Sequence, residues 1–169
     1  MTHKPFRYDG TSRYAMTKSG KIFLVGGYKT LSRVCSQIIK NGFAEYSTVN
    51  KASMKYKREE HSVCTIDKYL LVTGSFNIDL EQAYKRVERY DITRDKWEEL
   101  PTLNHGRAMH SSCSFNERYA FVFCGEEMPR GGLSKSIERL DNHQKETGWL
   151  LIEPKLNELV RPRQVPAVV

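Results

Sequence analysis

Two pairs of residues that could do chemistry recur in this chain at almost the same spacing. His61 and His110 lie 49 positions apart, and Glu88 and Glu138 lie 50 positions apart. Two histidines could ligate a metal ion, and two carboxylates could act as acid and base in glycoside hydrolysis. However, no carboxylate accompanies the histidines at metal-ligand spacing, and residues that recur with a repeat usually serve the fold. We therefore expect structural histidines, no metal, no cofactor, no catalytic residue and a protein that is not an enzyme.

These residues belong to a longer repeated pattern. Val87-Glu-Arg-Tyr-Asp91 is followed by Trp97, and Ile137-Glu-Arg-Leu-Asp141 is followed by Trp149. A period near 50 residues that is built from short strands is typical of a β-propeller, in which one repeat forms one four-stranded blade. The large Trp on the outer strand would fill the widening space between neighbouring blades.

Each repeat predicts four strands in the same order: an inner strand, an apolar strand buried on both faces, an alternating strand and an outer strand. In the clearest repeat these are 110–115, 119–124, 136–141 and 149–152, with residues 126–135 as a polar loop. In the repeat before it, the predicted strands are 61–66, 69–73, 85–91 and 97–100. In the first repeat they are 13–16, 21–25 and 33–39, and residues 43–46 stand where the other repeats carry Trp.

The pattern resembles the kelch repeat, in which an apolar run ends in Gly-Gly and a Val-Glu-x-Tyr-Asp strand and a spaced Trp follow. The resemblance covers residues 13 to 163 and implies an all-β fold of kelch-type blades at 13–57, 58–106 and 107–160, with 161–169 as the first strand of a fourth blade. The chain departs from the pattern in two respects. Only Gly26-Gly27 is an intact Gly-Gly pair, and the first repeat has no Trp.

About three blades do not close a ring, because propellers have four to eight. We therefore expect a partial propeller and favour a chain of which only part is represented here. The alternative is a half-ring that is completed by a second copy or by another protein.

A net charge of +7 and a pI of about 9.2 fit a solvated basic surface of no specific meaning, and the alternative is an acidic partner such as an acidic peptide, a nucleic acid or an anionic membrane. Apart from the Lys55–Arg58 cluster, the Lys and Arg residues are scattered, so a nucleic acid is not the expected partner. We expect a protein partner with an acidic segment.

The family resemblance implies where that partner would bind. In kelch-like adaptor proteins, the Arg that opens each repeat lines one face of the ring, and a second set of contact positions precedes the alternating strand. The matching opening residues are Arg13, Arg58, Arg107 and Arg163, and the second set is Arg33, Arg86 and Ser136. The alternative role of an opening Arg is structural, with the side chain capping loop carbonyls and holding adjacent blades together.

These features favour a protein-interaction scaffold or adaptor. A structural subunit of a large assembly is the alternative, with a propeller-based enzyme third. None of the four cysteines forms a C-x-x-C pair, and neither a membrane-spanning apolar run nor a secretory signal is evident. We expect reduced thiols and a cytoplasmic protein.

Overall fold

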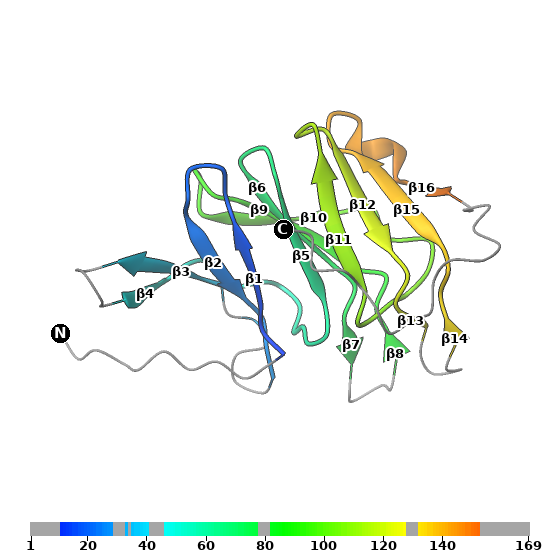
Figure 1. Ribbon diagram of the computed structural model, residues 1–169, viewed down its shortest axis with the longest axis horizontal. Helices are drawn as coiled ribbons and strands as arrows, with labels where there is room; N and C mark the ends of the chain where they lie inside the picture. Colours follow the sequence, from blue (N-terminus) through cyan, green and yellow to red (C-terminus); the bar gives the residue numbers. More distant parts are fainter. Residues whose placement is uncertain are drawn as a thin grey trace.

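The computed structural model describes residues 11–28, 33, 35–40, 46–77, 82–127 and 132–152. Within these ranges the chain forms β-strands joined by turns and loops, with one short 3₁₀ turn, η2 (Lys145–Thr147). Three four-stranded antiparallel sheets follow one another along the sequence, and two small hairpins project from one end of them (Figure 1). The predicted all-β fold of propeller blades is therefore confirmed.

Each sheet is one blade, and its strands lie side by side in sequence order. Blade 1 contains β1 (Arg13–Met16), β2 (Ile22–Val25), β3 (Cys35–Lys40) and β4 (Tyr46–Asn50). Blade 2 contains β5 (Ser62–Ile66), β6 (Tyr69–Thr73), β9 (Val87–Asp91) and β10 (Lys96–Leu100). Blade 3 contains β11 (Ser111–Phe115), β12 (Tyr119–Phe123), β15 (Ile137–Asp141) and β16 (Trp149–Ile152). The predicted start of a fourth blade, 161–169, lies outside the described residues.

The two hairpins lie between the second and third strands of blades 2 and 3. One pairs β7 (Phe76–Asn77) with β8 (Gln82–Ala83), and the other pairs β13 (Glu126–Glu127) with β14 (Gly132–Leu133). The sequence predicted a plain loop over 126–135, which is wrong at its two paired ends. Residues this polar carry no strand signal, and backbone pairing of short segments does not require one.

The blades stack through two apolar layers. We call the face that a blade turns toward the preceding blade its rear face, and the face toward the following blade its front face. The layer between blades 1 and 2 contains Ala15, Phe23, Val25, Cys35 and Met54 against Leu70, Val72, Tyr90 and Trp97. The layer between blades 2 and 3 contains Cys64, Ile66, Leu71, Val87, Leu100 and Leu103 against Ala120, Val122, Leu140 and Trp149.

Strand β6 shows why a continuous apolar run was the correct signal for a buried strand. Leu70 and Val72 face blade 1, whereas Leu71 between them faces blade 3, and all three are at most 1% exposed. Successive side chains of a strand alternate between its faces, so a strand between two layers needs apolar residues at every position. Each buried Leu or Val contributes about 1.5–3 kcal/mol relative to an exposed one.

The two tryptophans join neighbouring blades as predicted. Trp97 donates from Nε1 to the carbonyl of Ala52 at 2.7 Å, and Trp149 donates to the carbonyl of Pro101 at 3.0 Å. Each carbonyl belongs to the segment that leaves the preceding blade. The indole therefore fills the space between blades and satisfies its one donor there.

The position of the missing Trp in blade 1 differs from the prediction. Trp97 pairs with Tyr90 in blade 2, and the corresponding pair in blade 1 is Thr48 with Ile38. Thr48, and not the aromatic segment 43–46, therefore stands where the other blades carry Trp. Residues 43–45 lie outside the described residues, and the position of Thr48 follows from the pairing of β4 with β3.

Candidate binding face

The segments that carry the predicted contact residues gather at one end of the blades, which we call the loop end. Both hairpins project there, next to the segments that connect one blade to the next (Figure 1). Glu59 of the first connector bridges to Phe76, and Ala108 of the second bridges to Glu126. Connector and hairpin therefore form one layer at the loop end of blades 2 and 3.

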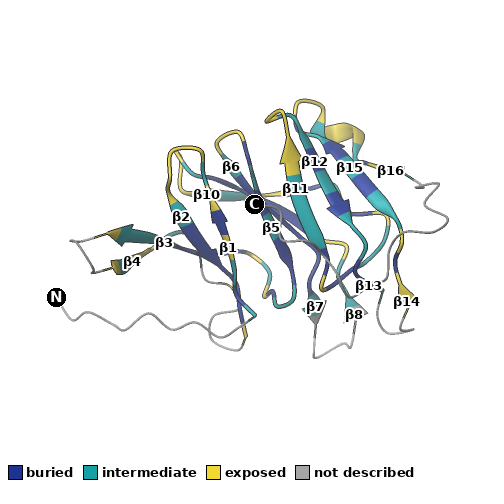
Figure 2. Ribbon diagram, viewed as in Figure 1, coloured by how far each residue is buried: buried dark blue, intermediate teal, exposed yellow. Residues whose placement is uncertain are grey.

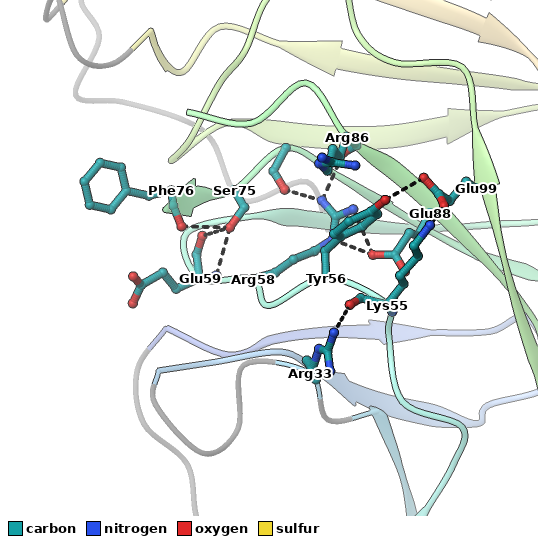
Figure 3. Close-up of polar contacts among 11 residues, drawn as sticks. Arg33, Lys55, Tyr56, Arg58, Glu59, Ser75, Phe76, Arg86, Glu88 and Glu99 are labelled. Atoms are coloured by element: carbon teal, nitrogen blue, oxygen red, sulfur yellow. Dashed lines mark hydrogen bonds and ion pairs between the residues drawn. The ribbon is translucent and has the colours of Figure 1, made fainter. Parts of the chain in front are cut away.

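Arg58 lies beneath this layer and is 1% exposed. Its guanidinium donates from Nε and Nη2 to Glu88 Oε2 at 3.0 and 2.9 Å. Nη1 donates to the carbonyls of Gly74 and Arg86. The side chain thus ties the connector to the end of β6 and the start of β9, and Figure 3 shows these bonds converging on one guanidinium.

Glu88 also caps the connector itself, because its Oε1 accepts a hydrogen bond from the backbone N–H of Lys55 at 2.7 Å. Burial lowers the pKa of Arg58, and the charge and hydrogen bonds of Glu88 oppose that effect. A fully buried charge is tolerated only when it is paired and hydrogen-bonded, as this one is.

Blade 3 repeats the same arrangement. Arg107 is 0% exposed and donates from Nη2 to Glu138 Oε1 at 2.6 Å and to Ser136 Oγ at 2.8 Å. Nη1 donates to the carbonyl of Cys124 at 2.7 Å. Glu138 in turn accepts the backbone N–H of Asn104 at 2.6 Å.

This geometry corrects the predicted binding role of Arg58 and Arg107. A guanidinium with no exposed surface, whose hydrogen bonds all go to groups of its own blade, cannot reach a partner. Both residues adopt the structural role that was the alternative, in which they cap loop carbonyls and join blades. Ser136 is likewise occupied, since its hydroxyl bonds to Arg107 and to Ser134 Oγ.

Arg13 is not the counterpart of Arg58 and Arg107. It pairs with Val25 in blade 1, as Ser62 pairs with Thr73 and Ser111 pairs with Phe123. Arg13 therefore occupies the first position of the inner strand, four residues after the position of the opening Arg. There its Nη2 binds Glu60 Oε2 at 2.7 Å, across to the next connector.

The remaining predicted residues, Arg33 and Arg86, are exposed at the loop end. The Arg86 guanidinium carbon lies 4.0 Å from the centre of the Tyr56 ring and 6.0 Å from that of Tyr84. Arg33 donates to the carbonyl of Lys55, which brings it to the same connector (Figure 3). Arg163 lies outside the described residues, and its predicted role stays a prediction.

A basic patch therefore surrounds Arg86. We define the Arg86 patch as Arg33, Lys55, Tyr56, Lys57, Lys85 and Arg86. One carboxylate is bound to it, because Glu99 pairs with Lys55 and accepts the Tyr56 hydroxyl at 2.9 Å. These two partners lower the pKa of Glu99, with the Lys55 bond the larger cause, so Glu99 stays ionised and neutralises only part of the patch.

Sequence reasoning missed Tyr56 and Glu99 as members of this patch. The interleaving of Lys55, Tyr56 and Lys57 was a usable signal, because an aromatic ring between cations can stack on a guanidinium. Glu99 carried no such signal in the sequence, because it lies on β10 and only the folded chain brings it next to Lys55 and Tyr56.

The two recurring histidines, which were predicted to be structural, are buried between blades. His110 Nε2 lies 2.8 Å from Thr73 Oγ1, and burial lowers the pKa of His110 to about 3, with Arg107 and Arg58 adding to the effect. The pKa of His61 is also lowered, mainly by burial. Within the described ranges, no group of three or more His, Cys, Asp or Glu side chains could hold a metal ion.

Glycines of the preceding blade make room for these imidazoles. A Cβ on Gly74 would lie 2.6 Å from His110 Cε1 and 2.3 Å from the carbonyl oxygen of Arg107. A Cβ on Gly26 would lie 2.5 Å from His61 Cε1. Gly26 and Gly74 are therefore required by close approach of the next blade.

Comparison with known proteins agrees with the repeat. Residues 57–104 match the family model described as the kelch motif, which confirms the resemblance predicted from 87–91 and Trp97. A search of the curated proteins found no match. None of the helices in the described ranges has the length and apolar character needed to cross a membrane.

Among solved structures, the chain is similar to the one titled "Structure of YjhT", with a TM-score of 0.70 and 14% sequence identity. The match covers 86% of this chain and 52% of that one, so this chain spans about half the length of the solved structure. At this identity the likeness shows the fold alone.

Proposed function

We propose that this protein is a non-catalytic interaction module and that the Arg86 patch binds an acidic segment of a protein partner. The observation that carries the proposal is the stacking of Arg86 on Tyr56 at 4.0 Å. Within the described residues, the Arg86 side chain donates no hydrogen bond. Its guanidinium is therefore held against the Tyr56 ring, and the residue is exposed to solvent.

A stacked guanidinium is well suited to bind a carboxylate. The planar fork of Arg matches the two oxygens of a carboxylate, and two parallel charge-assisted bonds are stronger than neutral ones. Because the Tyr56 ring already restricts the Arg86 side chain, less conformational entropy is lost when the partner binds.

The neighbouring cations extend the range of the attraction. Lys57 and Lys85 are both exposed and adjoin Tyr56 and Arg86 in the sequence. Opposite charges on exposed groups act within a Debye length, about 10 Å at 0.1 M salt. An acidic segment of several residues would therefore contact more than one member of the patch.

The kelch motif at 57–104 and the propeller fold support this proposal, because propeller loops commonly serve as binding surfaces. A scaffold or adaptor role follows if the acidic segment belongs to a protein that must be brought to another. The binding proposal is tested first, since the scaffold role depends on it.

The test uses a fluorescein-labelled twelve-residue peptide of alternating Glu and Ser, with fluorescence anisotropy at 50 mM salt. Arg86→Ala should weaken binding roughly tenfold, because a charge-assisted bond contributes about 1.5–3 kcal/mol. Arg86→Lys keeps the charge and loses the planar fork of donors. Its affinity for the peptide should therefore lie between those of the unchanged protein and the Arg86→Ala variant. Raising the salt to 0.3 M should weaken binding further.

Arg94→Ala is the matched control, because Arg94 is an exposed Arg in the turn between β9 and β10 and does not belong to the patch. It should bind the peptide as the unchanged protein does. Equal affinity of the Arg86→Ala and Arg94→Ala variants would refute the assignment of the patch, as would the absence of any peptide binding at low salt.

A further inference from the structure

Glu99 places a carboxylate of the protein itself inside the Arg86 patch. It lies on the rear face of blade 2, two residues after Trp97 on the outer strand β10, which carries exposed residues (Figure 2). Its Oε1 binds the Lys55 ammonium, and its Oε2 accepts the Tyr56 hydroxyl at 2.9 Å (Figure 3). Two donors of the patch therefore hold a carboxylate of the same chain.

Arg86 lies close to this carboxylate. The Arg86 guanidinium carbon is 4.0 Å from the centre of the Tyr56 ring, and the Lys55 ammonium is 5.2 Å from the same centre. The pKa of Glu99 is lowered mainly by its bonds to Lys55 and Tyr56, and the charge of Arg86 adds to the effect. The patch thus offers two cations around one aromatic ring, and Glu99 binds only one of them.

The blade does not require a carboxylate at this position. Strand register aligns Glu99 with Asn50 in blade 1 and with Leu151 in blade 3, so the carboxylate does not recur with the repeat. Glu99 also pairs directly with Glu88 across the two strands, and like charges directly opposite each other destabilise a sheet. The needs of the fold therefore do not explain Glu99.

The donors that hold Glu99 are specific to the first connector as well. Lys55 occupies the place that Asn104 has in the second connector, because the backbone N–H of each binds the buried carboxylate of the following blade. Tyr56 then stands where the second connector has His105. Of the two connectors in the described residues, only the first combines the cation with the tyrosine hydroxyl.

The bonds of Glu99 are of a kind that a partner exchanges readily. The Lys55 and Glu99 side chains are 60% and 46% exposed. An exposed ion pair contributes little to stability, because water solvates both partners and salt screens their attraction. A carboxylate from outside therefore takes the place of Glu99 without breaking a buried contact.

We propose that Lys55 and Tyr56 form a second carboxylate subsite beside Arg86, and that Glu99 occupies this subsite until an acidic segment displaces it. The inference rests on the proposed binding of an acidic segment to the Arg86 patch and narrows the kind of segment. The partner presents two carboxylates, one to the planar fork of Arg86 and one to Lys55 and Tyr56. In an extended segment, residues i and i+2 lie on the same side about 7 Å apart, a spacing that two cations around one ring match.

Glu99 makes the patch selective for such a segment. A partner with one carboxylate gains little by displacing Glu99, because one carboxylate then replaces another. A partner with two neighbouring carboxylates binds Arg86 with the first, which holds the second next to the subsite at a high effective concentration. The competing residue therefore discriminates against isolated acidic residues.

The first test measures binding of the labelled peptide of alternating Glu and Ser to the Glu99→Thr variant at 50 mM salt. Threonine favours a strand and removes the carboxylate, so the subsite is vacant. Binding should become about two- to fivefold tighter, because the peptide no longer competes with an exposed ion pair.

Glu98→Thr is the matched control, because it changes the net charge equally at the neighbouring residue. Glu98 is 45% exposed and binds Arg89 and Lys145 on the front face of blade 2, away from the patch. This variant should bind the peptide as the unchanged protein does, and a gain equal to that of Glu99→Thr would overturn the proposal.

Tyr56→Phe distinguishes a vacated subsite from a change of charge. It keeps the ring that contacts Arg86 and removes only the hydroxyl that binds Glu99. Because Glu99 then has one bond fewer to lose, the gain from Glu99→Thr should be smaller in the Tyr56→Phe background. An equal gain in both backgrounds would show that the hydroxyl is not part of a shared subsite.

The spacing of the two carboxylates is tested with two serine peptides of twelve residues and equal charge. One carries Glu-Ser-Glu at its centre, and the other carries one Glu at each end. The first should bind the unchanged protein several-fold more tightly. Equal affinity would contradict the requirement for two neighbouring carboxylates.

Unchanged or weaker binding by Glu99→Thr, with the peptide still bound by the unchanged protein, would overturn this proposal and leave the binding role of Arg86 in place. That role is decided separately by Arg86→Ala in the protein that keeps Glu99, so the two failures are distinguishable. Should Glu99→Thr fail to fold by circular dichroism, Glu99→Gln removes the charge alone and carries the same test.

Discussion

Replacing Arg58 by Met tests whether this residue builds the blade or contacts a partner. The substitution keeps a long, unbranched side chain and removes only the guanidinium. Arg58 makes two bonds to Glu88 and two to backbone carbonyls, and its side chain has no exposed surface. Removal would leave the Glu88 carboxylate buried with only the N–H of Lys55 as a partner.

The expected cost follows from that uncompensated charge. Breaking a buried ion pair by removing one partner typically costs about 3–5 kcal/mol. A protein of this size is stable by about 5–15 kcal/mol, so the loss would be a large fraction of the total. At about 2–4 °C per kcal/mol, the melting temperature should fall by roughly 10 °C.

Urea unfolding followed by tryptophan fluorescence measures this cost, because Trp97 and Trp149 lie between blades. Arg94→Met is the control: Arg94 is 76% exposed and 3.9 Å from Asp91, so its loss should cost less than about 0.5 kcal/mol. In the double variant Arg58→Met/Glu88→Leu the buried charge is gone, and we expect part of the stability to return. An Arg58→Met protein within about 1 kcal/mol of the unchanged one, yet defective in peptide binding, would refute the structural assignment.

Two further predictions concern the contacts between blades. Burial lowers the pKa of His110 to about 3, whereas His in an unfolded chain has a pKa near 6.5, so below pH 6.5 only the unfolded chain binds the proton. Stability should therefore fall as the pH drops, with His110 contributing a loss of about 2 kcal/mol between pH 7 and pH 5. Urea unfolding of His110→Asn at both pH values should lack that contribution, and an unchanged pH dependence would contradict the reasoning. Gly74→Ala should cost about 3 kcal/mol or more, because its Cβ would lie 2.3 Å from the carbonyl oxygen of Arg107 at a φ of +59°. Gly20→Ala, with a φ of +78° and open space around it, should cost only the backbone strain of about 1–2 kcal/mol, and equal losses at both positions would show that the close contact does not matter.

The sequence by itself determined that the chain forms four-stranded blades and roughly where two of them lie. The recurrence of 87–91 at 137–141, each with its Trp, identified two blades, and the apolar run at 69–73 identified a strand buried on both faces. These signals are local, because alternation and buried runs follow from the period of a strand and from the layers around it. The recurrence of His61 and His110 at equivalent positions predicted that they are structural.

Only the tertiary structure decided which arginines are available to a partner. Arg58 and Arg86 have the same chemistry in the sequence, yet one lies under a connector on Glu88 and the other lies on Tyr56 in solvent. Strand register separated Arg13 from Arg58 and moved the Trp position of blade 1 to Thr48. The physical reason is that burial depends on contacts between distant residues, such as Arg58 with Glu88, and that register depends on which residues of neighbouring strands pair, and residue types alone specify neither.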